Sequence, residues 1–314
     1  MTHPNEPLVG VVPSSSVGAA SGLQQPDHLI ARRFGRPIAF SGRESQSRKL
    51  HYVLASSLIV MTLLALLGRV IAPYDPVQPT GAPDLPLGSA HHLLGTDSIG
   101  RDLLSRMLWG LQVSWLSALL LVICGLVIGG IVGLIAGASG GIVDYLLMRI
   151  TDLFLAHPGP LITITIVAAL GYGLEHSLIA VTVFWWPFYA RMVRGEAKSL
   201  AARPHFEAAR LAGASRLRLL SRHLLPGIVP TVIVAASLDI ANGVLVLAGL
   251  SFLGLGEPAP HPELGADAAH NLSELLVHPW VAVLPGLAVL LLSLVGNVGG
   301  NSVRHIFATD GSHR

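Results

Sequence analysis

The sequence predicts an all-α membrane protein with six transmembrane helices. Of its 314 residues, 52% are hydrophobic and only 12% are charged, and the mean hydropathy is +0.63. A soluble globular domain carries about 25% charged residues, so this chain has too few charges to cover a surface that faces water. The apolar residues are gathered into six runs, most of them near the ~20 residues that a helix needs to cross a bilayer.

The segment before the first apolar run, residues 1–50, is rich in Pro, Ser, Gly and Gln and has no apolar periodicity. This composition is typical of disorder, and the segment lacks the apolar core and cleavage site of a secretory signal. Residues 1–50 are therefore predicted to be a disordered N-terminal tail. A second, short tail is predicted at the C-terminus, over residues 306–314.

Six transmembrane helices are predicted between the tails. The third is interrupted by two prolines, which break helices, and the fourth is short. The six ranges are 51–72, 108–138, 150–172, 178–192, 226–250 and 280–298. The first two are separated by a loop over residues 73–107.

The charged residues predict the orientation of these spans. Lys and Arg cluster before the first span and between the fourth and fifth, whereas the loop between the fifth and sixth has four acidic residues and no Lys or Arg. Basic segments beside spans face the cytoplasm. With six spans, both termini and the basic loop are therefore cytoplasmic, and residues 73–107 are extracytoplasmic. This topology explains the basic residues, so nucleic-acid binding is not expected.

The basic loop, residues 194–225, is predicted to contain two short helices joined at Gly213. Pro204 suits a first helical turn, and Glu207 then lies near the positive N-terminal end. Gly213 can take the left-handed conformation that ends a helix, and Ser215 can cap the next one. A short helix presented beside the membrane suits a groove in a partner protein, and an ordinary amphipathic interfacial helix is the alternative.

This loop resembles the EAA loop of bacterial ABC importer permeases. Glu207-Ala208-Ala209 is followed by Gly213 and later by the sequence Arg-His-Leu-Leu-Pro at residues 222–226, which is similar to the loop of peptide and nickel importers. In that family the loop transmits the ATP-driven closure of two ATPase subunits to the membrane helices. The resemblance implies that six residues couple the chain to an ATPase: His205, Glu207, Ala208, Ala209, Arg210 and Gly213.

Three further motifs extend the resemblance over most of the chain. Residues 94–102, LGTDSIGRD, resemble the LGTD–GRD signature of the dipeptide/oligopeptide/nickel importer family. Residues 144–158 match its D–MR–D–A–P stretch, and residues 250–256, LSFLGLG, match a third motif. Leu264 departs from the pattern, because the family usually has Trp there. The chain is thus similar to the C-type permease subunits of this family, which implies a type I ABC importer permease fold.

The resemblance also implies partners and a cargo. A permease core over residues 108–305 would pair with a B-type permease in the bacterial cell membrane, with two cytoplasmic ATPase subunits and an extracytoplasmic substrate-binding protein. The expected cargo is a di- or oligopeptide, and nickel, an opine-type metal chelate or glutathione are the alternatives. No catalytic residue or cofactor is expected on this chain, because it has no P-loop sequence and the partner subunits bind ATP.

Asp239 is the main ionisable residue within a predicted span. A charge at the bilayer centre costs about 3 kcal/mol or more, so such a residue usually faces the interior of a bundle or a cavity. Asp239 and Asn242 are predicted to line the substrate pathway. The alternative is an interhelical hydrogen bond of Asp239 with Asn242 or with the partner permease.

A metal site and a protease active site are not expected on this chain. Histidines such as His278 are scattered through the outer loops, and only His91 and His92 are closely spaced, so no metal site is predicted. Residues 137–140, Gly-Ala-Ser-Gly, resemble the nucleophile motif of rhomboid proteases. That chemistry needs a histidine base on another span, and the fifth and sixth spans have none. An intramembrane serine protease is the remote alternative.

Overall fold

The structure is a computed structural model that describes residues 41–311, and the regular structure in this range is helical apart from two isolated β-bridges. The chain divides into two units, residues 1–44 and 45–314, and the arrangement described below is that of the second. The prediction of an all-α protein is confirmed.

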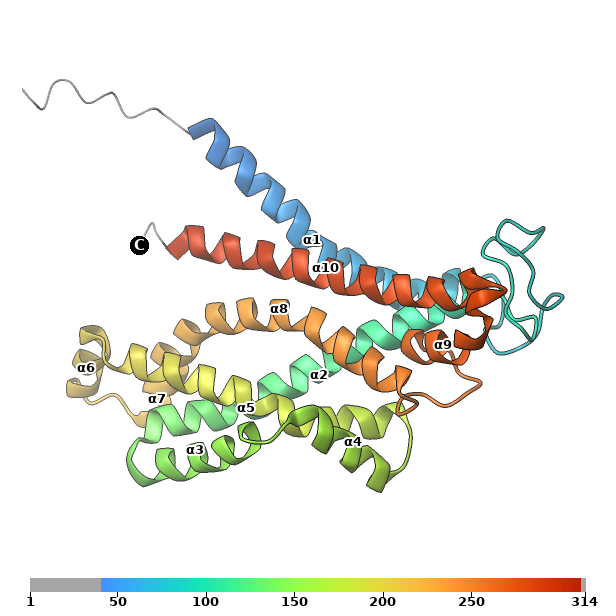
Figure 1. Cartoon of the computed structure of the whole chain (residues 1–314). Coiled ribbons are helices and arrows are strands. Elements are labelled where there is room, and N and C mark those ends of the chain that lie inside the picture. The colour runs from blue at the N-terminus through green and yellow to red at the C-terminus, as the bar shows by residue number, and fades with distance from the viewer. Residues whose placement is uncertain (1–40, 312–314) are drawn as a thin grey trace, which may run out of the picture. The chain divides into compact units, whose positions relative to one another are not determined.

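Five long helices carry most of the second unit. Their bounds are α1 Ser41–Ile71, α2 Leu103–Ser139, α5 Leu174–Ala201, α8 Leu225–Phe252 and α10 Pro279–Gly311. The remaining elements are shorter: α3 Gly141–Leu155, α4 Gly159–Leu170, α6 Pro204–Leu211, α7 Arg216–Leu219, the π-helical turn η1 Leu220–Leu224, α9 Leu264–His270 and the 3₁₀ helix η2 Leu272–Leu276. In Figure 1, α6 and α7 lie at one end of the bundle, and α9 lies at the other end beside the long loop that precedes α2.

Part of the predicted disordered N-terminal tail is helical, and so is part of the segment predicted as the C-terminal tail. Helix α1 begins at Ser41, and α10 continues to Gly311, so residues 41–50 and 306–311 are helical. The Glu, Gln, Arg and Lys residues before the first apolar run are good helix formers, and extending an existing helix costs far less than starting one. The rest of the predicted tails, residues 1–40 and 312–314, lies outside the described residues.

The number of membrane spans differs from the prediction. Among the described helices, four are long and apolar enough to cross a membrane, namely α1, α2, α8 and α10. Helices α3 and α4 pass the same test only together and are bent by 84°, because Pro158 and Pro160 interrupt the helix. Helix α5 has 28 residues but is not among the helices that are apolar enough to span a membrane. The structure therefore supports four spans, or five with the bent pair, and the predicted six are not reproduced.

Glycines on α2 allow its backbone to approach α5 closely. Gly125, Gly129, Gly133 and Gly137 recur every fourth residue and therefore share one helix face. A Cβ on Gly129 would lie 2.2 Å from the carbonyl oxygen of Trp186 in α5, and one on Gly133 would lie 2.3 Å from that of Ala190. Small residues at such contacts are the usual basis of helix packing within membranes. The stripe therefore fixes α5 against α2.

A cap covers the end of the bundle opposite α6. We define the cap as the loop 72–102, α9 and η2. Arg106 of α2 is buried beneath it and pairs with the Asp267 carboxylate, and it also donates to the carbonyl oxygens of Pro76 at 2.8 Å and Pro260 at 3.1 Å. Burial raises the pKa of the Asp267 carboxyl, although the Arg106 guanidinium acts against this shift. Arg106 thus joins three separate segments at the start of α2.

Candidate functional site

Helix α6 is presented outside the bundle, because none of its eight described residues is buried. Pro204 occupies the first turn, where the N–H that proline lacks would have no partner within the helix. Glu207 also lies in the first turn and Arg210 in the last, so each charge has the sign that the nearby end of the helix dipole favours. The predicted first helix of the basic loop is thus confirmed.

The end of α6 is a sharp left-handed turn at Gly213. Its φ is +81°, a conformation that other residues rarely adopt. The N–H of Gly213 donates to the carbonyl of Arg210 at 3.0 Å, and the N–H of Ala214 donates to that of Ala209 at 3.2 Å. These two hydrogen bonds form a Schellman motif. The predicted role of Gly213 in ending the helix is confirmed.

The second helix of the loop is not a separate element, so that prediction is wrong. Helix α7 begins after Ser215, whose Oγ accepts from the N–H of Arg218 at 3.4 Å. It then continues through η1 into α8, and the N–H of Leu225 donates to the carbonyl of Leu220, five residues back. Pro226 has no N–H to donate, and a π-helical turn accommodates such a break without ending the helix. The chain after Gly213 is therefore one continuous helix.

Phe206 attaches α6 to the bundle. It packs partly buried against a cluster from α5, η1 and α8 that contains Val193, Leu200 and Leu224. Beside it, a groove of about 540 Å³ separates α6 and α7 from the end of α2, and Glu207 lines this groove. The other coupling residues are exposed except for Ala209, which is half-buried. Helix α6 is thus a small knob held through one aromatic side chain.

Ion pairs fix α3 to α5 before the chain enters α6. The Asp144 carboxylate accepts from Arg194 and, at 2.5 Å, from Lys198. Further along, Asp152 accepts from Arg191 at 2.5 Å. These are carboxylates of α3 and cations of α5, so the basic residues of α5 also hold the bent pair in place.

Asp239 in α8 is bound by α5. Its Oδ2 accepts from Trp185 Nε1 at 2.5 Å and from the Tyr189 hydroxyl at 2.9 Å. Its Oδ1 accepts from Asn242 at 3.2 Å, and the Asn242 side chain is exposed. Both carboxylate oxygens therefore have partners, two of them from a neighbouring helix.

Comparison with known proteins decides the family. Residues 125–304 match the family described as "Binding-protein-dependent transport system inner membrane component". The chain belongs to that family. Two relatives are named glutathione transport system permease protein GsiD. That of Pectobacterium atrosepticum is 38% identical over 257 residues, covering 81% of this chain and 85% of the relative, and that of Escherichia coli O6:K15:H31 is 40% identical over 285 residues, covering 90% of each.

A solved structure gives a more distant comparison. The inward facing MetNI methionine ABC transporter has a TM-score of 0.48 and 22% identity over 64% of this chain and 96% of that chain. Family membership makes the present chain a membrane-embedded permease subunit of an ABC importer in the peptide/nickel branch. It is a transport subunit and not itself an enzyme, so the intramembrane protease alternative is excluded.

The structure brings together several residues that no sequence pattern had marked as functional. Trp185 and Tyr189 bind Asp239, and they had no role in the sequence analysis because aromatic residues in a span are usually packing residues. The glycine stripe of α2 was also overlooked, although its period of four is visible in the sequence. His92 is paired with Asp102 at 2.9 Å and not with its neighbour His91, so the closeness of two histidines in sequence was no guide to a site.

Proposed function

We propose that the chain forms, with a second permease, the translocation pathway for glutathione or a peptide of similar size. The supporting observation is the identity of 38–40% with two permeases named for glutathione transport, over most of both chains. This favours the alternative cargo of the sequence analysis over its main expectation of di- and oligopeptides in general. Glutathione is itself a tripeptide, so the two cargoes are chemically close.

We further propose that α6 is the coupling helix and faces the cytoplasm. Its surroundings are rich in Arg, which supports a cytoplasmic position. Leu211 at its end and Leu217 in α7 are 81% and 74% exposed. Large apolar side chains exposed beside charges on a projecting knob suit a groove in a protein partner. The proposed partners are two ATPase subunits that bind the ATP, a B-type permease and an extracytoplasmic binding protein.

The continuous helix after Gly213 connects α6 directly to α8 in the core of the bundle. Displacement of α6 moves the chain at Gly213 and with it the helix formed by α7, η1 and α8. Asp239 lies on α8, and its hydrogen bonds to Trp185 and Tyr189 join that helix to α5. We propose that Asp239 chiefly holds these two helices together, and that the exposed Asn242 beside it lines the pathway.

Reversing one charge on α6 tests the coupling. We expect Glu207→Arg to lower ATP-driven uptake at least about tenfold, because a like-charge contact in an interface costs several kcal/mol. The matched control is Glu196→Arg, which makes the same charge change on α5. Uptake into vesicles and co-purification of the ATPase are measured for both variants. If uptake and ATPase co-purification both persist in Glu207→Arg, and also in a variant that lacks Gly213, the proposed docking site is wrong.

The cargo is tested on the cognate binding protein and on the assembled transporter. We expect titration calorimetry to show that the binding protein binds glutathione more tightly than dipeptides or Ni²⁺. We also expect proteoliposomes with all subunits to take up labelled glutathione only when ATP is supplied. Tighter binding of dipeptides, together with uptake that unlabelled dipeptides abolish and glutathione does not, would restore the original expectation.

A further inference from the structure

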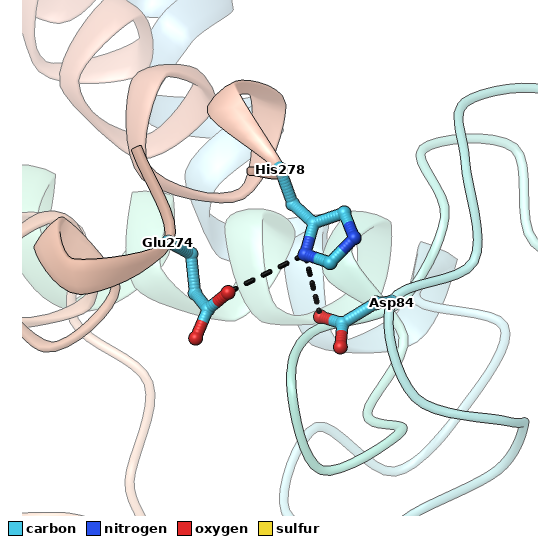
Figure 2. A group of neighbouring side chains, drawn as sticks. All are labelled: Asp84, Glu274 and His278. Atoms are coloured by element: carbon cyan, nitrogen blue, oxygen red, sulfur yellow. Dashed lines mark hydrogen bonds and ion pairs between the residues drawn. The ribbon is translucent and has the colours of Figure 1, made fainter. Parts of the chain in front are cut away.

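Three potential metal ligands converge in the cap, although they come from distant parts of the sequence. Asp84 belongs to the loop 72–102, Glu274 to η2, and His278 precedes α10. Figure 2 shows both carboxylates turned toward Nδ1 of His278. Nδ1 lies 3.5 Å from Oδ1 of Asp84 and 3.3 Å from Oε2 of Glu274, and the three ligand atoms lie within 4.8 Å of one another.

Hydrogen bonds alone do not account for the way both carboxylates approach the His278 ring. Nδ1 carries at most one proton, which it can donate well to only one oxygen. Both distances are also long for a charged hydrogen bond, which is usually about 2.7–2.9 Å. Oδ1 of Asp84 is shielded from solvent and has no hydrogen-bond partner among the described residues. An anionic oxygen left in this state is costly, and it points to a missing positive charge.

A metal ion supplies that charge and fits the distances. Zinc binds histidine nitrogen and carboxylate oxygen at about 2.0–2.2 Å in a tetrahedron, so neighbouring ligand atoms are separated by about 3.3–3.6 Å. The two separations from Nδ1, 3.3 and 3.5 Å, fall in this range. The three side chains are 25–28% exposed, which leaves a fourth position open to water. We propose that Asp84, Glu274 and His278 bind a divalent transition-metal ion of the Zn²⁺ type.

The position of the site indicates what the ion does. The Trp280 ring packs edge-on against the His278 ring with centroids 5.3 Å apart and holds the imidazole in place. An ion on Nδ1 would connect the loop 72–102, through Asp84, to η2 and the start of α10. The bound ion would thus stabilise the folded cap. This inference does not depend on the proposed cargo or on the ATPase-docking role of α6.

Cobalt is a suitable spectroscopic probe, because Co²⁺ occupies zinc sites and absorbs visible light. The full chain is purified in detergent with its histidine tag removed, and Co²⁺ is titrated in. We expect one Co²⁺ per chain with the intense visible bands of a four- or five-coordinate ion, and stoichiometric displacement by Zn²⁺. Since even outer-shell changes weaken metal sites about 10- to 100-fold, His278→Ala should weaken binding by at least that much. Asp84→Asn and Glu274→Gln should each weaken it at least about tenfold.

Two further variants separate a real site from misfolding or chance binding. His261→Ala removes an exposed histidine from the loop between α8 and α9 and should leave binding unchanged. His278→Cys should retain one Co²⁺ per chain and add a sulfur-to-cobalt charge-transfer band that the parent, which already has the free Cys124, does not show. The proposal is overturned if the chain binds no Co²⁺ or Zn²⁺, if His278→Ala binds as the parent does, or if His261→Ala loses binding equally.

Discussion

Replacing Gly129 with alanine is expected to force α2 away from α5 and to lower the melting temperature by several degrees or more. The added Cβ would lie 2.2 Å from the carbonyl oxygen of Trp186 and 2.7 Å from the Cβ of Tyr189. The first of these atoms belongs to a helix backbone and cannot rotate aside. Overpacking a tight contact typically costs about 1–3 kcal/mol, and a backbone clash lies at the upper end. Thermal unfolding in detergent, followed by tryptophan fluorescence, measures the change.

The neighbouring residue provides the matched control. A Cβ on Gly130 would meet no described atom within 4 Å, and Gly130→Ala makes the same chemical change in the same helix. Because helix propensity favours alanine equally at both positions, it cancels in the comparison. Gly130→Ala should therefore melt at or above the parent temperature. Equal melting temperatures for the two variants would show that the glycine stripe does not hold α2 against α5.

The second large effect is expected at the base of the cap. Arg106→Met should lower the free energy of unfolding by about 3–5 kcal/mol, the usual result of leaving a buried charge without its partner. The variant strands the Asp267 carboxylate and removes donors from the carbonyls of Pro76 and Pro260. The measurement is thermal unfolding together with proteolysis of the loop 72–102. A double variant, Arg106→Met with Asp267→Leu, should recover part of the loss, because it no longer buries a lone charge.

The pH dependence of this variant follows from the raised pKa of Asp267. Arg106 lowers the pKa of the Asp267 carboxyl through its charge and through its hydrogen bond, so the folded-state pKa rises further when Arg106 is removed. A carboxyl with a higher pKa in the folded than in the unfolded state binds its proton more readily when folded, and lowering the pH then stabilises the fold. The deficit of Arg106→Met should therefore shrink as the pH falls below neutral. A deficit that is constant with pH would contradict the stranded-carboxylate explanation.

Local sequence signals were sufficient to predict individual turns of the fold, such as those at the two ends of α6. Pro204 and Gly213 each have a strong conformational preference, so the start and end of α6 could be predicted from residue type alone. The same approach failed at Pro226, where a proline lies within a continuous helix, since a π-helical turn takes up the break. It failed at Ser41 because the polar start of α1 has no apolar periodicity to identify it.

Contacts between distant segments could not be predicted, for a different reason. The spacing of residues along the chain carries no information about which helix will face Asp239, and its partners Trp185 and Tyr189 lie on another helix. The ligands Asp84 and His278 are still further apart in sequence, so no short motif marks them. Such clusters exist only once the helices have packed.

The dimensions of α2 have a mechanical consequence. A helix of 37 residues is about 55 Å long at 1.5 Å per residue, well beyond the ~30 Å of a hydrocarbon core. Its first turns carry Arg106 beneath the cap, and its last residue, Ser139, borders the groove beside α6. The glycine stripe brings the backbone of α2 close to α5, so we expect the two helices to move together as one rigid pair. If α6 moves as proposed, a displacement at the groove should tilt α2 and so also move the residues beneath the cap.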